Sequence, residues 1–504
     1  MDTISTLWQL DTIGRATDYV TNSENEYLHL QNFIDNKFLD RTHTSEWIDS
    51  LDPRSGNVSV KVPLSPPNVV DYAVNVAARA FRAWSKTLPC ERSDLLLRIA
   101  DIVEGNKEMF SVWETIDQGK QLNRARCEVD RAIELFRYFA RYILNDGDSA
   151  VHLNKAPKQS TLTYERRLPI GVYAIITSSN MPFYLLASKI APCLAFGCTG
   201  VAKPSEHTSM TAFLLAEVLL KAQLPPGVMN IVFGNGPNTG STLVGLPLVQ
   251  GVSFTGETET GIQIRKDTAV DIHKRLSLEL QGSCPTLVFG DVDLDEAVAT
   301  TAYAAFENSG QLCLGGSRIY VYRSIYKTFV TKLIQFVIGN YQVARDLGPV
   351  VSREHYDKLR SHLVQANEEH VRFEIGEIPK EAPNDGFWVS PTILSYIHPD
   401  SLLVQKEIFG PVAAVHSFDT EAEVISLCNN NTNGMGAVIL TDDLSRMRRV
   451  GEDLDAGLTW GSCWLGRELG AGLSDPKAAG TGRGGGARSR DIFTRLQSVH
   501  VPSY

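Results

Sequence analysis

Between residues 171 and 267, short apolar runs alternate with longer segments of helical length. The run "GVYAII" (171–176) precedes "MPFYLLASKIAPCLAF", which predicts a helix with Pro182 in its first turn. The same order returns in "TGVAKPSE" with "MTAFLLAEVLLKAQL", and in "VQGVSFTG" with "TETGIQIRK". Short apolar strands joined by helices are typical of a parallel sheet that is covered on both faces. The alternation therefore predicts an α/β fold with a Rossmann-like sheet.

A second α/β lobe is expected after residue 284, where the alternation starts again. We expect its helices over 294–306, over 325–338 and near 420–428. A chain of 504 residues is also too long for one hydrophobic core, which independently favours two lobes.

Four further segments carry a local pattern. Apolar residues at helical spacing predict helices over 68–86 and 91–110. The stretches "STLTYERR" (160–167) and "RLQSVHVPS" (495–503) alternate between the two faces of a strand. We expect these two strands to pair with each other outside both lobes, in contact with a partner subunit.

Composition restricts the partners and the compartment. The net charge of −10 argues against nucleic acid or an anionic membrane as a partner, and no apolar run is long enough to span a bilayer. Residues 1–28 form a polar leader whose one arginine is Arg15, unlike a secretory or mitochondrial signal. Eight scattered cysteines without a CxxC pair argue against a metal site and favour the reducing cytoplasm.

Three residues have the settings of an acyl-transfer site. Cys313 lies among small residues in "NSGQLCLGGS", Asn180 follows the first predicted strand, and Glu279 lies in the apolar "LSLELQGS". A thiol nucleophile, an amide that stabilises an oxyanion and a carboxylate base would suffice for that chemistry. Each residue also has a structural alternative. Asn180 could be a turn or cap residue, Glu279 could be in a salt bridge, and Cys313 could belong to the core.

Six ordered motifs carry a resemblance to a known family: "SNMPF", "AKPSE", "FTGETETG", "LELQGS", "NSGQLC" and "EIFGPV". From about residue 30 to the C-terminus, the chain resembles the aldehyde dehydrogenase superfamily. The resemblance implies a Rossmann-like NAD-binding domain (29–147 and 170–281) and an α/β catalytic domain (282–478). It also implies a small β oligomerisation element (148–169 and 479–504) and a homodimer or homotetramer.

The resemblance also implies a mechanism. Cys313 would attack a small-molecule aldehyde, while the Asn180 amide and the Cys313 backbone N–H hold the oxyanion. Hydride transfer to NAD would leave a thioester, and Glu279 would activate the water that hydrolyses it. No metal is required.

Nine residues stand at the positions where the family has its cofactor-binding residues. Lys203 and Glu206 would hold the adenosine ribose, and the Glu206 carboxylate favours NAD over NADP. Glu407 would bind the nicotinamide ribose, beside Phe409. The full set implied by the resemblance is Lys203, Ser205, Glu206, Gly256, Glu257, Gly261, Leu280, Glu407 and Phe409.

Within the superfamily, the chain is most similar to the 2-aminomuconate semialdehyde dehydrogenase group. The stretches "NFIDNKFL", "PPGVMNIVFG" and "SCWLGREL" carry this similarity. In that group two arginines are thought to bind a substrate carboxylate, and the matching positions here are Arg131 and Arg467. The implied substrate is a small semialdehyde that bears a carboxylate. Solvated arginines on a helix and a loop are the alternative interpretation.

Several positions depart from the family pattern. Ser178 and Ser179 stand for a Pro and a Trp, Glu257 for a Ser, Gln281 for a Gly, and "GLSD" (472–475) for "PFGG". Glu257 would place a carboxylate at a helix N-terminus where the cofactor pyrophosphate is expected. Two other functions therefore stay open: a catalytically impaired paralogue with a binding or structural role, and a cofactor-independent thiol esterase.

Overall fold

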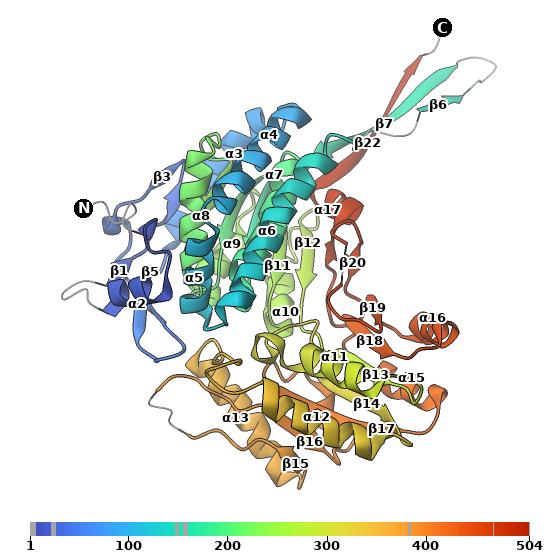
Figure 1. Cartoon of the computed structure of the whole chain (residues 1–504). Coiled ribbons are helices and arrows are strands. Elements are labelled where there is room, and N and C mark those ends of the chain that lie inside the picture. Colours follow the sequence, from blue (N-terminus) through green and yellow to red (C-terminus); the bar gives the residue numbers. More distant parts are fainter. Residues whose placement is uncertain are drawn as a thin grey trace.

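The computed structural model contains two α/β lobes and a β-ribbon arm (Figure 1). This architecture confirms the predicted fold class. The residues that the structure describes are 7–21, 27–146, 151–154, 160–381, 385–466 and 468–502.

The first lobe is built on a seven-stranded sheet of order β12-β11-β8-β9-β10-β2-β3. Its strands are β2 (Phe33–Ile34), β3 (Lys37–Phe38), β8 (Val172–Ile176), β9 (Thr199–Lys203), β10 (Met229–Ile231), β11 (Val249–Thr255) and β12 (Arg275–Glu279). The five strands from β8 to β12 are parallel, and every residue of β8 and β9 is buried. The chain runs outward from β8 to β10 and then returns to β11 on the other side of β8. The strand order thus reverses between β8 and β11, where open α/β sheets bind ligands.

Helices cover both faces of this sheet (Figure 1). They are α3 (Pro67–Trp84), α4 (Pro89–Glu104), α5 (Lys107–Gln118), α6 (Leu122–Tyr142), α7 (Pro182–Ala195), α8 (Met210–Lys221), α9 (Ser241–Gly245) and α10 (Thr258–Asp267). The helix predicted over 68–86 is α3, and Pro182 begins α7 as predicted. The single helix predicted over 91–110 is wrong, because α4 ends before Gly105 and α5 begins at Lys107. Glycine is a poor helix former, and here it separates the two helices.

The second lobe has a seven-stranded sheet of order β15-β16-β17-β14-β13-β18-β19. Its strands are β13 (Pro285–Val288), β14 (Arg318–Tyr322), β15 (Arg372–Ile375), β16 (Thr392–Ser395), β17 (Val412–Phe418), β18 (Gly436–Leu440) and β19 (Leu458–Gly461). Its helices are α11 (Leu294–Phe306), α12 (Tyr326–Asn340), α13 (Arg353–Glu368), α14 (Leu402–Gln405), α15 (Glu421–Asn429) and α16 (Leu444–Asp453). Helices α11, α12 and α15 lie within two residues of their predicted bounds.

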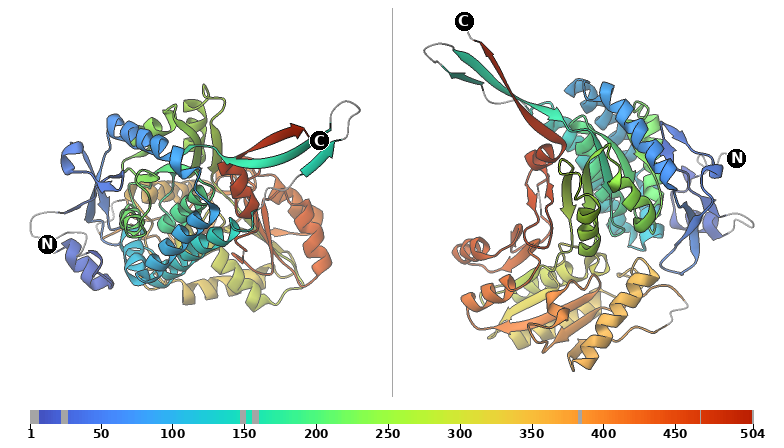
Figure 2. Two further views of the ribbon diagram at one scale, coloured as in Figure 1. Left: turned by 90° about the horizontal axis from the view of Figure 1, so that it is seen from above. Right: turned by 180° about the vertical axis from the view of Figure 1, so that it is seen from behind.

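The arm projects from the body in all three views (Figures 1 and 2). It consists of β6 (Val151–Asn154), β7 (Thr161–Pro169) and β22 (Thr494–Pro502). Strands β7 and β22 pair antiparallel from Thr161–Pro502 to Pro169–Thr494. The predicted pairing of the two isolated strands is therefore confirmed. The predicted domain boundary at 281/282 falls between β12 and β13.

Two smaller sheets complete the fold. One contains β1 (Leu28–His29), β4 (Trp47–Leu51) and β5 (Val58–Pro63), and the other contains β20 (Leu473–Ser474) and β21 (Arg483–Gly484). Helix α17 (Gly486–Phe493) leads into the arm. Its last residue, Phe493, is buried in the core of the first lobe, where its ring centroid lies 4.5 Å from that of Tyr173.

The N-terminal segment packs on the first lobe. It contains α2 (Ile13–Thr21), which contacts α5, and Leu7, Leu10 and Ala16 are buried in the same core as the lobe's own helices. Residues 7–16 of the leader thus contribute apolar side chains to the core of the first lobe. Over the described part of the chain, no helix has the length and hydrophobicity needed to cross a membrane.

Candidate active site

The chain approaches Cys313 through three consecutive residues in the left-handed backbone region. The φ angles of Asn308, Ser309 and Gly310 are 53°, 56° and 68°. A Cβ atom on Gly310 would lie 2.0 Å from the carbonyl oxygen of Gly410, so only glycine fits there. This conformation is unfavourable for Asn308 and Ser309 and persists only where contacts impose it. One such contact is the Ser309 hydroxyl, which donates to the Gly348 carbonyl at 2.8 Å.

Cys313 itself is half-buried at the junction of the two lobes. A Cβ atom on Gly282, which follows β12, would lie 1.6 Å from the Cys313 carbonyl oxygen, so the two backbones touch. Burial raises the pKa of the Cys313 thiol well above its usual value, and the nearby Glu407 and Glu279 carboxylates act in the same direction. The thiol is therefore protonated at neutral pH in this state and must pass its proton to another group before it can act as a nucleophile.

The structure brings the Asn180 side chain next to the Cys313 segment. Its Nδ2 donates to the Gln311 carbonyl at 2.9 Å, and its Oδ1 accepts from the Ser178 hydroxyl at 2.9 Å. The second Nδ2 hydrogen has no acceptor among the described residues. Because Ser178 fixes which side of the amide carries the oxygen, this second N–H remains available for an oxyanion.

A buried charge cluster holds the backbone of Asn180. Lys120, which follows α5, donates from Nζ to the Asn180 carbonyl at 3.0 Å and to Glu114 at 3.3 Å, and it also pairs with Glu128. Asn308 donates to the same Asn180 carbonyl at 3.1 Å. This cluster was not predicted from the sequence, in which no motif contains Lys120.

Glu279 is the last residue of β12 and is paired with a lysine. Its Oε2 accepts from Lys189 at 3.0 Å and from the Thr255 hydroxyl at 2.7 Å. The structure therefore shows Glu279 in a salt bridge, which was the structural alternative expected for this residue. Lys189 was also missed, although a single lysine inside the apolar α7 is itself a signal.

A second carboxylate lies beside Glu279. A Cβ atom on Gly482 would lie 2.1 Å from Asp475 Oδ2 and 2.6 Å from Glu279 Cγ, so both side chains meet over Gly482. Asp475 is buried and contributes to the raised pKa of the Cys313 thiol. The segment 472–475, which departs from the family pattern, thus adds an acid to the site.

The candidate cofactor residues lie around the point where the strand order reverses. Lys203 ends β9, and its buried Nζ donates to the Gly234 carbonyl at 2.7 Å and pairs with Glu206 at 3.5 Å. Burial is the largest single influence on the pKa of Glu206 and raises it, but the Lys203 charge, His207 and hydrogen bonds together outweigh burial, so the pKa is lowered and this carboxylate is ionised. The buried hydroxyl of Thr177, directly after β8, has no hydrogen-bond partner among the described residues. A paired lysine, an ionised carboxylate and an unsatisfied hydroxyl at this edge of the sheet fit a ribose-containing ligand.

Two glycines and one serine of the predicted cofactor set lie at the same edge of the sheet, in close contact with its loops. A Cβ atom on Gly261 would lie 2.5 Å from Leu280, and one on Gly256 would lie 2.4 Å from Phe254. The Ser205 hydroxyl accepts from the His207 backbone at 3.3 Å. These contacts explain why the loops after β9 and β11 can lie close to the sheet.

The other candidate cofactor residues belong to the second lobe, where burial raises the pKa of Glu407 to about 8. Phe409 lies beside His355, with ring centroids 5.7 Å apart, and His355 Nε2 contacts the Phe409 carbonyl. Glu257 stands at the N-cap of α10, as its place in the motif predicts, but its carboxylate is paired with Lys358 at 2.6 Å. Neither His355 nor Lys358 was found from the sequence.

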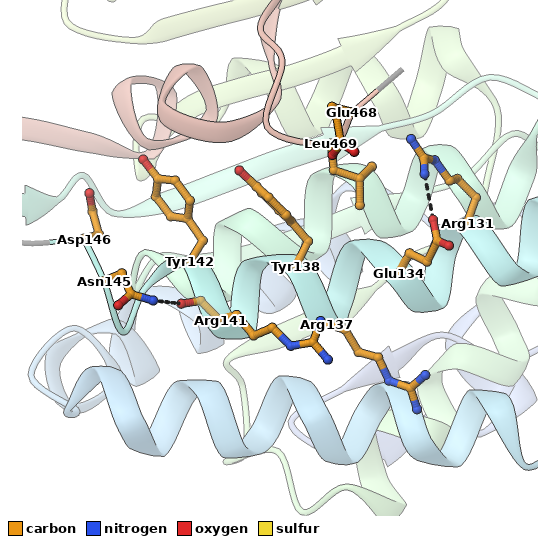
Figure 3. A pocket seen from close by; sticks show the side chains of 10 residues that line it. All are labelled: Arg131, Glu134, Arg137, Tyr138, Arg141, Tyr142, Asn145, Asp146, Glu468 and Leu469. Atoms are coloured by element: carbon orange, nitrogen blue, oxygen red, sulfur yellow. Dashed lines mark hydrogen bonds and ion pairs between the residues drawn. The ribbon is translucent and has the colours of Figure 1, made fainter. Parts of the chain in front are cut away.

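Arg131 lies on the outer face of α6. Its guanidinium donates to Glu134 at 2.7 Å, and it lines a surface hollow of about 730 Å³ together with Glu468 and Leu469 (Figure 3). Arg467, the second predicted substrate arginine, lies outside the described residues. Among the described residues, no group of three His, Cys, Asp or Glu side chains could hold a metal ion.

Comparisons with known proteins agree with this geometry. The model of the aldehyde dehydrogenase family matches residues 38–499. A 2-aminomuconic semialdehyde dehydrogenase of Danio rerio is 40% identical and covers 94% of this chain and 99% of its own length. A 2-aminomuconic 6-semialdehyde dehydrogenase of Pseudomonas sp is 35% identical over 94% of this chain and 97% of its own length.

The solved structures give the same result. The structure of HpcC from Thermus thermophilus has a TM-score of 0.91 and 32% identity, and covers 97% of this chain and 95% of that chain. An indole-3-acetaldehyde dehydrogenase complexed with NAD+ has a TM-score of 0.90 and 28% identity, and covers 97% of this chain and 99% of its own. With the motifs, the two-lobed fold and these matches all in agreement, the chain belongs to the aldehyde dehydrogenase family.

Proposed function

We propose that this protein oxidises a small, carboxylate-bearing semialdehyde, such as 2-aminomuconic semialdehyde, to the acid with NAD. The observation that carries the proposal is the convergence of Cys313, Asn180 and Glu279 from separate elements of the two lobes. Asn180 donates into the turn that carries Cys313, and Glu279 and Glu407 are close enough to raise the pKa of the thiol.

The chemistry starts at the Cys313 thiol. Glu279 accepts the thiol proton, and Sγ then attacks the aldehyde carbonyl carbon. The carbonyl oxygen becomes an oxyanion, to which the Asn180 Nδ2–H and the Cys313 backbone N–H donate. After oxidation, Glu279 releases the thiol proton to solvent and then takes a proton from the water that attacks the thioester. The Cys313 thiolate leaves as the acid forms, and Glu279 returns this second proton to it.

NAD, when bound, supplies the acceptor for the hydride. Lys203 and Glu206 would hold the adenosine ribose and Glu407 the nicotinamide ribose, with Phe409 beside the ring. Because Glu206 is ionised, it repels a 2′-phosphate and favours NAD over NADP.

The substrate carboxylate is assigned to Arg131 and Arg467. The resemblance to the semialdehyde dehydrogenases implies this role for both positions, and among the described residues Arg131, Glu468 and Leu469 line one surface hollow. A guanidinium can hold a carboxylate through two parallel hydrogen bonds, so it can select an acidic semialdehyde over a neutral aldehyde of the same length.

Steady-state NADH formation tests this assignment. Arg131→Ala should raise KM for 2-hydroxymuconic semialdehyde about tenfold or more and leave KM for a neutral aldehyde of similar length nearly unchanged. Arg126→Ala is the matched control, since Arg126 is on the same helix, similarly exposed and paired with Glu108. An unchanged KM for the acidic substrate would refute the role of Arg131.

The same assay separates the other two functions. An impaired paralogue would give no NADH at millimolar NAD although it is folded. A thiol esterase would cleave p-nitrophenyl acetate without NAD but would give no NADH.

We also infer that the arm joins copies of this chain into a homodimer or homotetramer. The β7–β22 ribbon projects from the body and carries few buried side chains in a single copy (Figure 2). Truncation after Phe493 should lower the mass measured by light scattering, whereas removal of residues 503–504 should not.

A further inference from the structure

An ion pair connects the two lobes beside the proposed cofactor residues. Glu257 caps α10 in the first lobe, and Lys358 lies on α13 in the second lobe. The Glu257 carboxylate and the Lys358 ammonium group are 2.6 Å apart, although the residues are 101 positions apart in the chain. No part of the local sequence around either residue requires this contact.

The surroundings place the pair over the proposed cofactor site. Lys358 and Glu257 both act on the pKa of Glu407, in opposite directions, and both act on the pKa of His355, which contacts Phe409. Glu257 also directly follows the turn after β11, beside the point where the strand order reverses. The pair therefore lies between the proposed nicotinamide-ribose residues and the N-terminus of α10.

The N-terminus of α10 favours an anion, but the Glu257 carboxylate makes no capping hydrogen bond to the helix and is paired with Lys358 instead. A dinucleotide whose pyrophosphate binds at this end of the helix would meet both charges. The Glu257 carboxylate would repel the pyrophosphate, and the two anions would compete for the one lysine. Both side chains are substantially exposed, 56% for Glu257 and 43% for Lys358, so solvent screens their attraction and a bound ligand can replace it.

We propose that the Glu257–Lys358 ion pair, here called the clasp, joins the two lobes in the free protein. NAD opens the clasp when its pyrophosphate replaces the Glu257 carboxylate as the partner of Lys358. Lys358 then exchanges one anionic partner for another. The inference rests on the proposed use of NAD. In this proposal, the Glu257 carboxylate competes with the cofactor pyrophosphate, and the Lys358 charge attracts the pyrophosphate. The two residues therefore have opposite effects on cofactor binding, although they attract each other in the free protein.

Equilibrium titration of NAD by calorimetry, without aldehyde, tests the clasp. Glu257→Gln should lower the Kd of NAD about threefold to tenfold, because the competing anion is removed. Lys358→Met should raise the Kd by a similar factor, because Glu257 then has no cation and repels the pyrophosphate. Adenosine, which has no phosphate, should bind both variants and the unchanged protein alike.

Matched controls are available on the same helix and in the same lobe. Glu259→Gln removes an acid from the first turn of α10, and Lys332→Met removes an exposed, paired lysine of the second lobe. Each should change the Kd of NAD less than twofold. Thermal unfolding of all variants confirms that they are folded.

A purely structural ion pair predicts another result. Loss of either partner would then shift the Kd of NAD in the same direction, or not at all, and either outcome overturns the clasp. If neither the unchanged protein nor Glu257→Gln binds NAD, the use of NAD fails together with the clasp. Binding that is equal in all variants refutes the clasp alone.

Discussion

The Lys189 ammonium group lies 3.0 Å from the Glu279 carboxylate, and it reaches there from the middle of an almost wholly apolar helix. The lysine side chain is 3% exposed, so the pair is shielded from water and salt. The Thr255 hydroxyl donates to the same carboxylate oxygen at 2.7 Å. Two donors from separate elements thus fix the position of the proposed base.

Lys189→Met should lower kcat about tenfold and leave the Kd of NAD unchanged. Lys189 donates to the Glu279 carboxylate, so its loss removes a contact that holds the proposed base in position. Initial rates at saturating NAD measure this loss. Lys274→Met is the control, because Lys274 is another buried lysine of the same lobe. An unchanged kcat in Lys189→Met would contradict the proposed role.

Ser178→Ala should lower kcat about tenfold and leave the Kd of NAD unchanged. The Ser178 hydroxyl fixes the orientation of the Asn180 amide, and its loss allows the amide to turn its oxygen toward the oxyanion. Ser178→Thr keeps the hydroxyl and should keep most of the activity, and Ser179→Ala tests the neighbouring serine. An equal loss in the alanine and threonine variants would show that space, and not the hydrogen bond, matters.

Glu407→Gln should stabilise the protein, and the gain should grow from pH 5 to pH 8. Burial raises the pKa of Glu407 to about 8 from its usual 4.5, so between these values the folded state binds more protons than the unfolded state. Stability therefore falls as the pH rises, and the neutral Gln avoids this loss. We expect a gain in Tm of about 3 °C or more at pH 8. Scanning calorimetry measures it, with the exposed Glu354→Gln as control. An equal Tm difference at pH 5 and 8 would contradict the shifted pKa.

The sequence predicted well those features that depend on neighbours along the chain. The alternation of strands and helices, the start of α7 at Pro182 and the two arm strands all follow from local patterns. The end of α4 at Gly105 was missed because the apolar spacing continues across the glycine. Cys313, Asn180 and Glu279 were identified because each lies in a motif, although no local pattern shows that they meet.

The partners of these residues could not be predicted, for a physical reason. Lys120 lies 60 positions from Asn180, and Lys358 lies 101 positions from Glu257. Such contacts depend on how helices pack on a sheet and how the lobes meet, which periodicity does not contain. The sequence places the Glu257 carboxylate where the cofactor pyrophosphate is expected. It does not show that Lys358, on the other lobe, pairs with this carboxylate.

The burial of Phe493 among the residues of the first lobe has a consequence for synthesis. The ring is made 320 positions after Tyr173, its neighbour in that core. The strands and helices of the first lobe are therefore synthesised long before the residue that completes their packing. The lobe can close this part of its core only after the whole second lobe has been made, so the apolar surface around Tyr173 stays uncovered by Phe493 until then.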